Sequence, residues 1–156
     1  MKRLLAAVAL MAGSVPAYAQ QPDAAPAGRI MGTALNVTDL DAAVKFYTEG
    51  LGMRVALTLD LGAKTETILT FGADPARPSI LLMHAKDPAA RKPLVQGDAF
   101  SRLVLGFADL EPVAQRLTAL GYAPGPIRDA GHGARILMVR DPAGFALELV
   151  QYDAKR

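Results

Sequence analysis

Hydrophobic and polar positions follow a clear pattern between Gly32 and Met53. Up to Val37 the side chains alternate as in a β-strand, with Leu35 and Val37 on one face that is expected to pack on a helix. The residues of the other face are small or polar: Gly32, Ala34 and Asn36. We therefore expect this second face to point away from the core, and Asn36 is a candidate polar contact for a ligand.

Apolar residues then recur at three- and four-residue intervals, which predicts an amphipathic helix. This apolar stripe consists of Leu40, Ala43, Val44, Tyr47 and Leu51. Thr38 is the expected N-cap, with Asp41 three residues later as its capping-box partner. Glycines at 50 and 52 favour termination of the helix there.

Three short strands are predicted after this helix, at 53–60, 64–71 and 79–86, because alternating segments are separated by turn residues. The first half of the chain is thus a βαβββ module. A stretch rich in proline and charge, 87–99, follows and is expected to link this module to the second half.

The second half repeats the first, in an alignment that places Asp39 on Asp109. It predicts a strand at 100–107 and a helix capped by Asp109, with Pro112 tolerated in its first turn. Further strands are predicted at 123–129, 134–140 and 145–152. Two copies of one βαβββ unit predict a pseudo-symmetric α+β fold with a site where the copies meet.

The first 19 residues have the pattern of a secretory signal peptide. Lys2 and Arg3 precede an apolar run that is too short to span a bilayer, and Ala17-Tyr18-Ala19 suits a signal peptidase. We expect cleavage after Ala19, a disordered lead-in over 20–28, and a periplasmic or secreted protein that is not held in a membrane.

Charge and cysteine content narrow the function classes. Cleavage would remove two of the 17 basic residues and none of the 15 acidic ones, which leaves no net charge. The sequence also lacks a cationic cluster, so we expect no nucleic-acid partner. The chain has no cysteine, which excludes disulfides, thiolate nucleophiles and cysteine-rich metal sites.

Three stretches of the sequence resemble the vicinal oxygen chelate (VOC) superfamily of glyoxalases, bleomycin-resistance proteins and extradiol dioxygenases. They are NVTDLDAAVKFYTEGLGMRV, FADLEPVAQRLTALGY and DPAGFALELVQ. The resemblance implies one domain over 29–153, with module 1 at 29–86, a linker at 87–99 and module 2 at 100–153. It implies that the strands form an eight-stranded, cup-shaped mixed sheet with helices outside and a small-molecule ligand inside. It also implies a homodimer.

In the metal-dependent enzymes of this superfamily, four ligands line the cup. The resemblance carries them onto Gly32 and Leu82 in module 1 and Arg102 and Glu148 in module 2. Among these four residues only Glu148 is a metal ligand, and one carboxylate cannot hold a catalytic Zn, Ni, Mn or Fe ion. We therefore expect no cofactor, with a divalent metal held by Glu148 and non-standard ligands as the alternative.

Arg102 and Glu148 are expected to lie close together at the position of the family's metal. In a functional interpretation, Arg102 binds an anionic or carbonyl-bearing ligand and Glu148 orients that ligand or acts as a base. In a structural interpretation, the two form an ion pair that fills the vacated space. Two histidines are further candidates for ligand contact: His84, two residues beyond Leu82, and His132, between two glycines. The alternative is that His84 is a histidine at a strand end and His132 an exposed loop histidine.

Three functions remain open from the sequence. The first is an exported small-molecule-binding protein whose cup sequesters or carries a ligand without chemistry. The second is a glyoxalase-like lyase, isomerase or dioxygenase that uses Glu148. The third is a module whose cup is filled by side chains and whose role is protein interaction.

Overall fold

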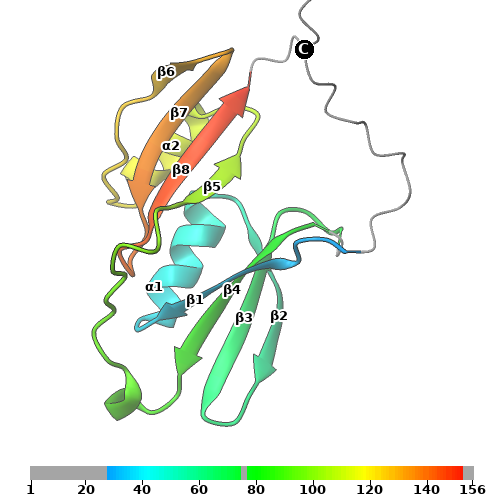
Figure 1. Ribbon diagram of the computed structural model, residues 1–156, viewed down its shortest axis with the longest axis vertical. Helices are drawn as coiled ribbons and strands as arrows, with labels where there is room; N and C mark the ends of the chain where they lie inside the picture. The colour runs from blue at the N-terminus through cyan, green and yellow to red at the C-terminus, as the bar shows by residue number, and fades with distance from the viewer. Residues whose placement is uncertain (1–27, 75–76, 153–156) are drawn as a thin grey trace, which may run out of the picture.

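The computed structural model describes residues 28–74 and 77–152, so the predicted signal peptide, nearly all of the lead-in and the last four residues lie outside the described residues. The described elements form two βαβββ modules, as predicted, and each module has its own four-stranded sheet (Figure 1). In the described part of the chain, no helix is long and apolar enough to cross a membrane.

In module 1 the strand order is β1-β4-β3-β2, with β1 parallel to β4 and the other neighbours antiparallel. Its elements are β1 (Gly32–Val37), α1 (Leu40–Lys45), the π-helical turn η1 (Phe46–Gly50), β2 (Arg54–Asp60), β3 (Lys64–Thr70) and β4 (Ser79–Ala85). The linker contains one 3-10 turn, η2 (Pro88–Ala90).

Module 2 repeats this topology, with the strand order β5-β8-β7-β6 and β5 parallel to β8. Its elements are β5 (Leu103–Gly106), α2 (Glu111–Ala119), β6 (Arg128–Gly131), β7 (Ala134–Arg140) and β8 (Ala146–Tyr152). The sequence repeat is therefore a repeat of strand pairing as well as of element order.

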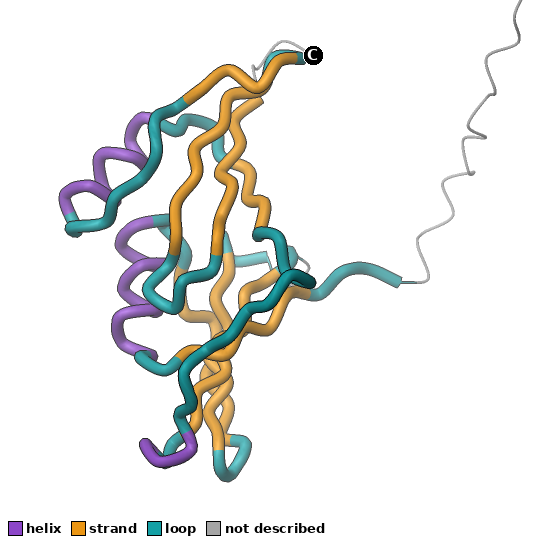
Figure 2. The backbone as a smooth tube through the Cα atoms, turned by 60° about the vertical axis from the view of Figure 1, so that its left-hand side comes forward, coloured by secondary structure: helices purple, strands orange, loops and turns teal. Residues whose placement is uncertain are grey.

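The helices α1, η1 and α2 lie on one side of the two sheets, as Figure 2 shows. The core lies between these helices and the sheets, and it includes Leu35, Val37, Leu82, Leu147 and Leu149. We call the opposite side of each sheet its open face. Because side chains alternate across a strand, residues that neighbour these core positions point to the open face.

Two strand predictions need correction. The strand predicted at 123–129 begins only at Arg128, because Pro124 and Pro126 cannot donate to a strand ladder. The strand predicted at 100–107 is the shorter β5, because the residues before Leu103 are not paired in the sheet. The N-terminal end of β5 therefore carries Arg102 just outside the regular sheet.

The predicted cap of the first helix is wrong by one residue. Asp39, not Thr38, is the N-cap: its backbone is extended and its carboxylate accepts a hydrogen bond from the Ala42 amide at 3.0 Å. In the second helix, the Asp109 carboxylate accepts from the Glu111 amide at 3.1 Å, and Pro112 lies in the first turn as predicted. The predicted cap Asp109 is therefore one residue early, because the N-cap of α2 is Leu110, which forms no side-chain capping bond.

The two modules are joined by a buried polar contact. The Tyr47 hydroxyl, from module 1, donates a hydrogen bond of 2.9 Å to the Asp141 carboxylate of module 2. Tyr47 is fully buried and Asp141 is 4% exposed. Burial and the negative charge of Asp141 raise the pKa of Tyr47, so the phenol remains protonated and acts as the donor.

Apolar contacts surround this hydrogen bond. The rings of Phe46 and Tyr122 meet edge-to-face with centroids 4.8 Å apart, and Phe71 meets Phe107 in the same way at 5.6 Å. Both pairs cross from module 1 to module 2, and such aromatic pairs add stability beyond their buried area. The relative placement of the two sheets therefore rests on packed contacts, not only on the linker.

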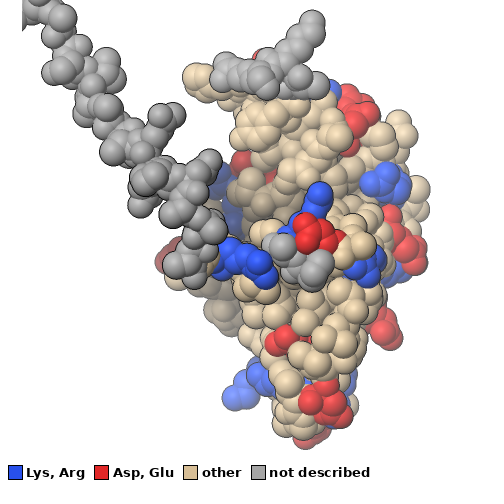
Figure 3. Space-filling view, turned by 90° about the vertical axis from the view of Figure 1, so that its right-hand side faces the viewer, with Lys and Arg blue, Asp and Glu red and all other residues tan. Residues whose placement is uncertain are grey.

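The exposed charges are mixed in sign. On the side of the molecule seen in Figure 3, acidic and basic side chains are interspersed among uncharged residues. A nucleic-acid-binding face would instead carry clustered Lys and Arg side chains over a broad surface. This face therefore gives no support to a nucleic-acid partner.

Candidate functional site

An ion pair lies on the open face of module 2. The Arg102 Nε is 2.5 Å from the Glu148 Oε2, with side-chain exposures of 44% and 18%. Glu148 is the partner of Val104 on β5 and of Met138 on β7, so the pair is flanked by apolar side chains. The structure thus brings together the two charged residues that the sequence predicts at one site.

The module 1 position predicted at Leu82 is wrong. Leu82 is fully buried and pairs with Leu35, so it faces the helices and belongs to the core. The repeat identifies the correct residue. In module 2, Glu148 pairs with Val104. The residue of module 1 that is equivalent to Val104 is Ala34, and Ala34 pairs with Leu81. Leu81 on the open face is therefore the counterpart of Glu148.

Gly32 lies where β1 approaches β4 too closely for any side chain. A Cβ atom on Gly32 would be 2.3 Å from the Ser79 carbonyl oxygen and 2.7 Å from a Leu81 methyl group. A backbone oxygen cannot move aside as a flexible side chain does, so a histidine or glutamine here would require the strands to separate. The local backbone thus excludes the side chain that a metal ligand would need.

The predicted position of His84 is also wrong, for the same reason as that of Leu82. His84 pairs with Val37 and Thr65, which places it on the helix side of β4 and away from the open face. His132 has a left-handed backbone, with a φ of 54°, in the exposed turn between β6 and β7. The pocket at that turn is lined by neither Arg102 nor Glu148. The structure therefore does not bring either histidine to the ion pair.

Asn36 lies on the open face as predicted, beside Met83, and it lines a small pocket that the sequence did not reveal. The pocket has a volume of about 180 Å³ and forms where the linker crosses the open face of module 1. Three cations line it: Lys64, Arg91 and Lys92. Such a concentration of positive charge favours the binding of an anionic group.

The linker holds this pocket in place through Arg91. The Arg91 Nε donates to the Ala85 carbonyl at 2.9 Å, and Nη2 donates to the Lys86 carbonyl at 3.0 Å. Among the described residues, neither Lys64 nor Lys92 forms an ion pair or a side-chain hydrogen bond, so both ammonium groups remain available. Only the fold of 87–99 back onto the sheet brings Lys92 near Lys64.

The residues at the family's four ligand positions do not fit a divalent metal. Gly32 and Leu81 supply no donor atom, and Arg102 is a permanent cation that already holds the Glu148 carboxylate. Across 28–74 and 77–152, no three His, Cys, Asp or Glu side chains are grouped so that they could share a metal ion. A catalytic metal requires about three protein donors.

Comparison with known proteins establishes the family. A family model described as "Glyoxalase/Bleomycin resistance protein/Dioxygenase superfamily" matches residues 29–149. The chain belongs to this superfamily, and its two βαβββ modules have the superfamily's fold.

The most similar relatives that we compared carry the name of one enzyme. A probable lactoylglutathione lyase of Vibrio parahaemolyticus is 30% identical over 129 residues, which cover 80% of this chain and 91% of the relative. The lactoylglutathione lyase of Haemophilus influenzae is 26% identical over 127 residues, 79% of this chain and 92% of the relative.

Solved structures agree on the fold. The trypanothione-dependent glyoxalase I of Leishmania major superposes with a TM-score of 0.67 at 25% identity, covering 80% of this chain and 86% of that enzyme. TnmS3, an antibiotic-binding protein from Streptomyces, superposes with a TM-score of 0.63 at 21% identity, covering 81% of this chain and 97% of that protein. Both an enzyme and a binding protein are thus among the structural relatives.

Proposed function

We propose that this chain is a glyoxalase-like protein that binds a small anionic or carbonyl-containing molecule on the open face, without the superfamily's metal centre. The observation that carries this proposal is the Arg102–Glu148 ion pair at 2.5 Å, where a guanidinium stands in place of a metal ligand. An arginine supplies positive charge and directional donors to a carboxylate or carbonyl oxygen.

The ion pair retains capacity for a ligand. Arg102 uses Nε for Glu148 and Nη1 for the Ser101 hydroxyl, so Nη2 remains free among the described residues. Glu148 engages Arg102 through Oε2, which leaves Oε1 as an acceptor. A ligand carboxylate or carbonyl can therefore accept a hydrogen bond from Nη2, and a hydroxyl beside it, in ligands that have one, would donate to Oε1.

The cationic pocket of module 1 is a second candidate site for an anionic group. Lys64, Arg91 and Lys92 surround a volume of about 180 Å³ on the open face of module 1, with Asn36 as a neutral hydrogen-bonding partner. A terminal carboxylate or phosphate would offset the mutual repulsion of three cations. In this interpretation Asn36 and the three cations bind an anion separately from the ion pair, because neither Arg102 nor Glu148 lines this pocket.

A homodimer would complete the cup. The open face of module 1 exposes apolar side chains, including Leu57 at 50% and Leu59 at 37%, and module 2 exposes Val104 at 58%. Exposed apolar residues that line up on one face are typical of an interaction surface. We infer that a second copy covers them, and that the chain acts in the periplasm or outside the cell after removal of residues 1–19.

A metal-dependent lyase is the second candidate. The names of the relatives favour it, and Glu148, 18% exposed, keeps a carboxylate on the open face. It would need metal-ligand donors other than Gly32, Leu81 and Arg102. A dependence on glutathione or trypanothione would be inferred from the names of the relatives alone. The binding function needs no such additional donors, so we prefer it.

A thermal-shift screen of the full chain tests the proposal. We expect pyruvate, which carries both a carboxylate and a carbonyl, to raise the melting temperature in a saturable way, because a ligand of the native state stabilises it. The shift should be the same with and without EDTA. Acetone, which lacks the carboxylate, should give a smaller shift. A pyruvate shift that appears only when a divalent metal is added would favour the lyase instead.

A further inference from the structure

A second cavity lies at the junction of the two modules, apart from the open-face site. It has a volume of about 580 Å³. Residues of β1, the start of β4 and the whole of β5 line it, together with Met53, Phe71 and Pro78. Its size falls in the range of small-molecule sites, about 300 to 1,000 Å³, which often form where two structural units meet.

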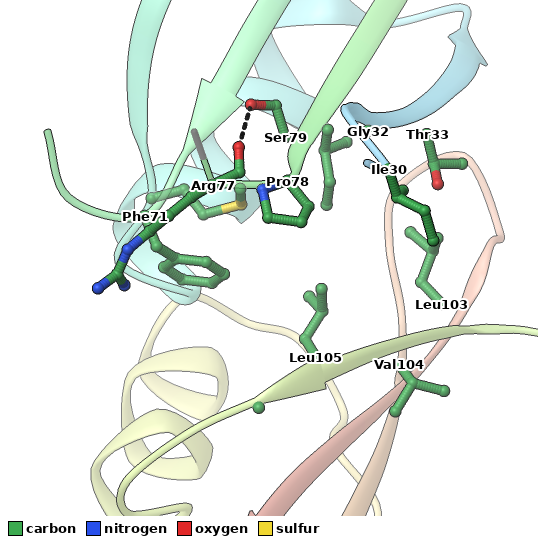
Figure 4. Close-up of a pocket in the computed structure, with 13 residues that line it drawn as sticks. Ile30, Gly32, Thr33, Phe71, Arg77, Pro78, Ser79, Leu103, Val104 and Leu105 are labelled. Atoms are coloured by element: carbon green, nitrogen blue, oxygen red, sulfur yellow. Dashed lines mark hydrogen bonds between the residues drawn. The ribbon is translucent and has the colours of Figure 1, made fainter. Parts of the chain in front are cut away.

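The cavity lies on the opposite side of β5 from the Arg102–Glu148 pair. Figure 4 shows Leu103 and Leu105 pointing into the cavity and Val104 pointing away from it. Val104 is the residue that pairs with Glu148, so Glu148 lies on the far side of the strand. A ligand in the cavity would therefore not touch the ion pair.

The cavity walls are mainly apolar. Phe71 and Pro78 face Leu105 across the space, and Ile30, which is 76% exposed, lies over Leu103 (Figure 4). Large apolar side chains left in contact with water favour a bound apolar group, at roughly 25 cal/mol for each Å² covered. The hydrophobic body of a bound ligand would therefore be stabilised by covering these apolar side chains.

One end of the cavity carries a positive charge. Arg77 is among the residues that line the cavity, and its side chain runs past the Phe71 ring to a guanidinium on the outer side of that ring (Figure 4). No acidic residue is among the described residues that line the cavity. The Ser79 hydroxyl donates to the Arg77 carbonyl at 3.4 Å, which ties the backbone of Arg77 to the start of β4.

We propose that this junction cavity binds an amphipathic organic anion, with an acyl or aromatic body between Phe71 and Leu105 and a carboxylate or sulfonate at Arg77. The charge complementarity of Arg77 and the lack of acidic lining residues select the anion. The apolar walls select a body larger than the ligand of the open-face site. Nothing in this proposal depends on the function proposed for Arg102 and Glu148.

Calorimetric titration of the full chain with decanoate tests this proposal, with decanol as a neutral analogue of the same length. We expect saturable binding of one decanoate per chain. Arg77→Gln should weaken decanoate binding about ten-fold through loss of a charge-assisted contact, and leave decanol binding within about two-fold. Arg128→Gln, which removes an exposed cation from β6, is the matched control and should change neither.

A cavity-filling variant tests the location. Thr33 is exposed and its side chain points toward Leu103 (Figure 4), so Thr33→Trp should fill part of the cavity and weaken decanoate and decanol alike, by about ten-fold or more. Thr58→Trp, at an exposed threonine of β2 outside the cavity, is the control. Leu105→Trp, from the opposite wall, provides a second filling variant if Thr33→Trp lowers the melting temperature.

Three results would overturn the proposal. Decanoate binding that survives both filling variants would place the ligand elsewhere. Decanoate binding lost in Arg102→Met would place it at the open-face site. A Thr33→Trp variant that changes the sedimentation coefficient of the protein without changing decanoate affinity would show that this surface contacts a second copy of the chain.

Discussion

Replacing Asp141 with alanine is expected to lower the free energy of unfolding by about 3 kcal/mol, the largest loss of stability predicted for a single polar substitution in this chain. The carboxylate accepts hydrogen bonds from the Tyr47 hydroxyl at 2.9 Å, the Ala143 amide at 3.0 Å and the Phe145 amide at 2.8 Å. Alanine would leave these three donors without a partner in or near the core. Urea denaturation of the full chain measures the loss.

Tyr47→Phe is the matched control for this prediction. It removes only the hydrogen bond between the modules and should lower stability by about 1 kcal/mol, because the ring remains in place. A loss in Asp141→Ala no larger than that in Tyr47→Phe would contradict the view that the carboxylate organises both the turn and the junction.

The same carboxyl group predicts a pH dependence. Burial raises the pKa of Asp141 above 3.8, and this effect outweighs its hydrogen bonds from Tyr47 and from backbone amides, which lower the pKa. The folded state thus holds this proton more tightly than the unfolded state does. The contribution of Asp141 to stability therefore falls as pH rises from about 3.8 through the folded pKa, and is constant above it. Asp141→Asn should lack this fall.

Replacing Arg102 with methionine is expected to reduce the affinity for pyruvate by about ten- to a hundred-fold, because it removes a charged hydrogen-bond donor. Methionine keeps much of the side-chain length without the charge. Isothermal titration calorimetry measures the affinity, and urea denaturation of the same samples separates binding from folding. Arg102 is 44% exposed, so the substitution should change stability little.

Arg135→Met is the matched control for Arg102→Met. Arg135 also forms an ion pair with a Nη2–Oε1 distance of 2.5 Å, to Glu111, but it lies on the helix side of β7. It should leave pyruvate binding unchanged. If Arg102→Met also leaves binding unchanged and alters only stability, the Arg102–Glu148 pair is a structural ion pair and the functional interpretation is wrong.

The repeat made much of the fold predictable from the sequence. The alternation of Leu35 and Val37 with small residues correctly identifies the core side of β1, and the offset between Asp39 and Asp109 correctly predicts the second βαβββ module. These signals are local, because they depend on side-chain periodicity and capping within a few residues.

The wrong prediction at Leu82 shows that the sequence alone could not assign the two faces of β4. Residues 80–83 of β4 are all apolar, so a period of two does not say which of them face the helices. Only the pairing of Leu81 with Ala34 shows which residues of β4 point to the open face. A shift of the pairing by one residue would exchange the two faces. The same ambiguity misplaced His84, whereas alternation around the charged Glu148 left no doubt in module 2.

The cationic pocket and the junction cavity were not predictable for a different reason. Lys64 and Lys92 are far apart in the sequence, and they share a pocket because the linker folds back over the sheet. Arg77 and Leu105 share a cavity because two sheets meet at their edges. Such long-range juxtapositions leave no periodic signal in a single sequence.

Elemental analysis of the full chain tests most directly whether an arginine has replaced the metal. The protein is purified without chelator, exposed to Zn, Ni, Mn and Fe salts, and then separated from free ions. We predict clearly less than one bound divalent ion per chain, and equal retention in wild type and in Glu148→Gln. About one ion per wild-type chain, lost in Glu148→Gln, would contradict the replacement and favour the metal-dependent lyase.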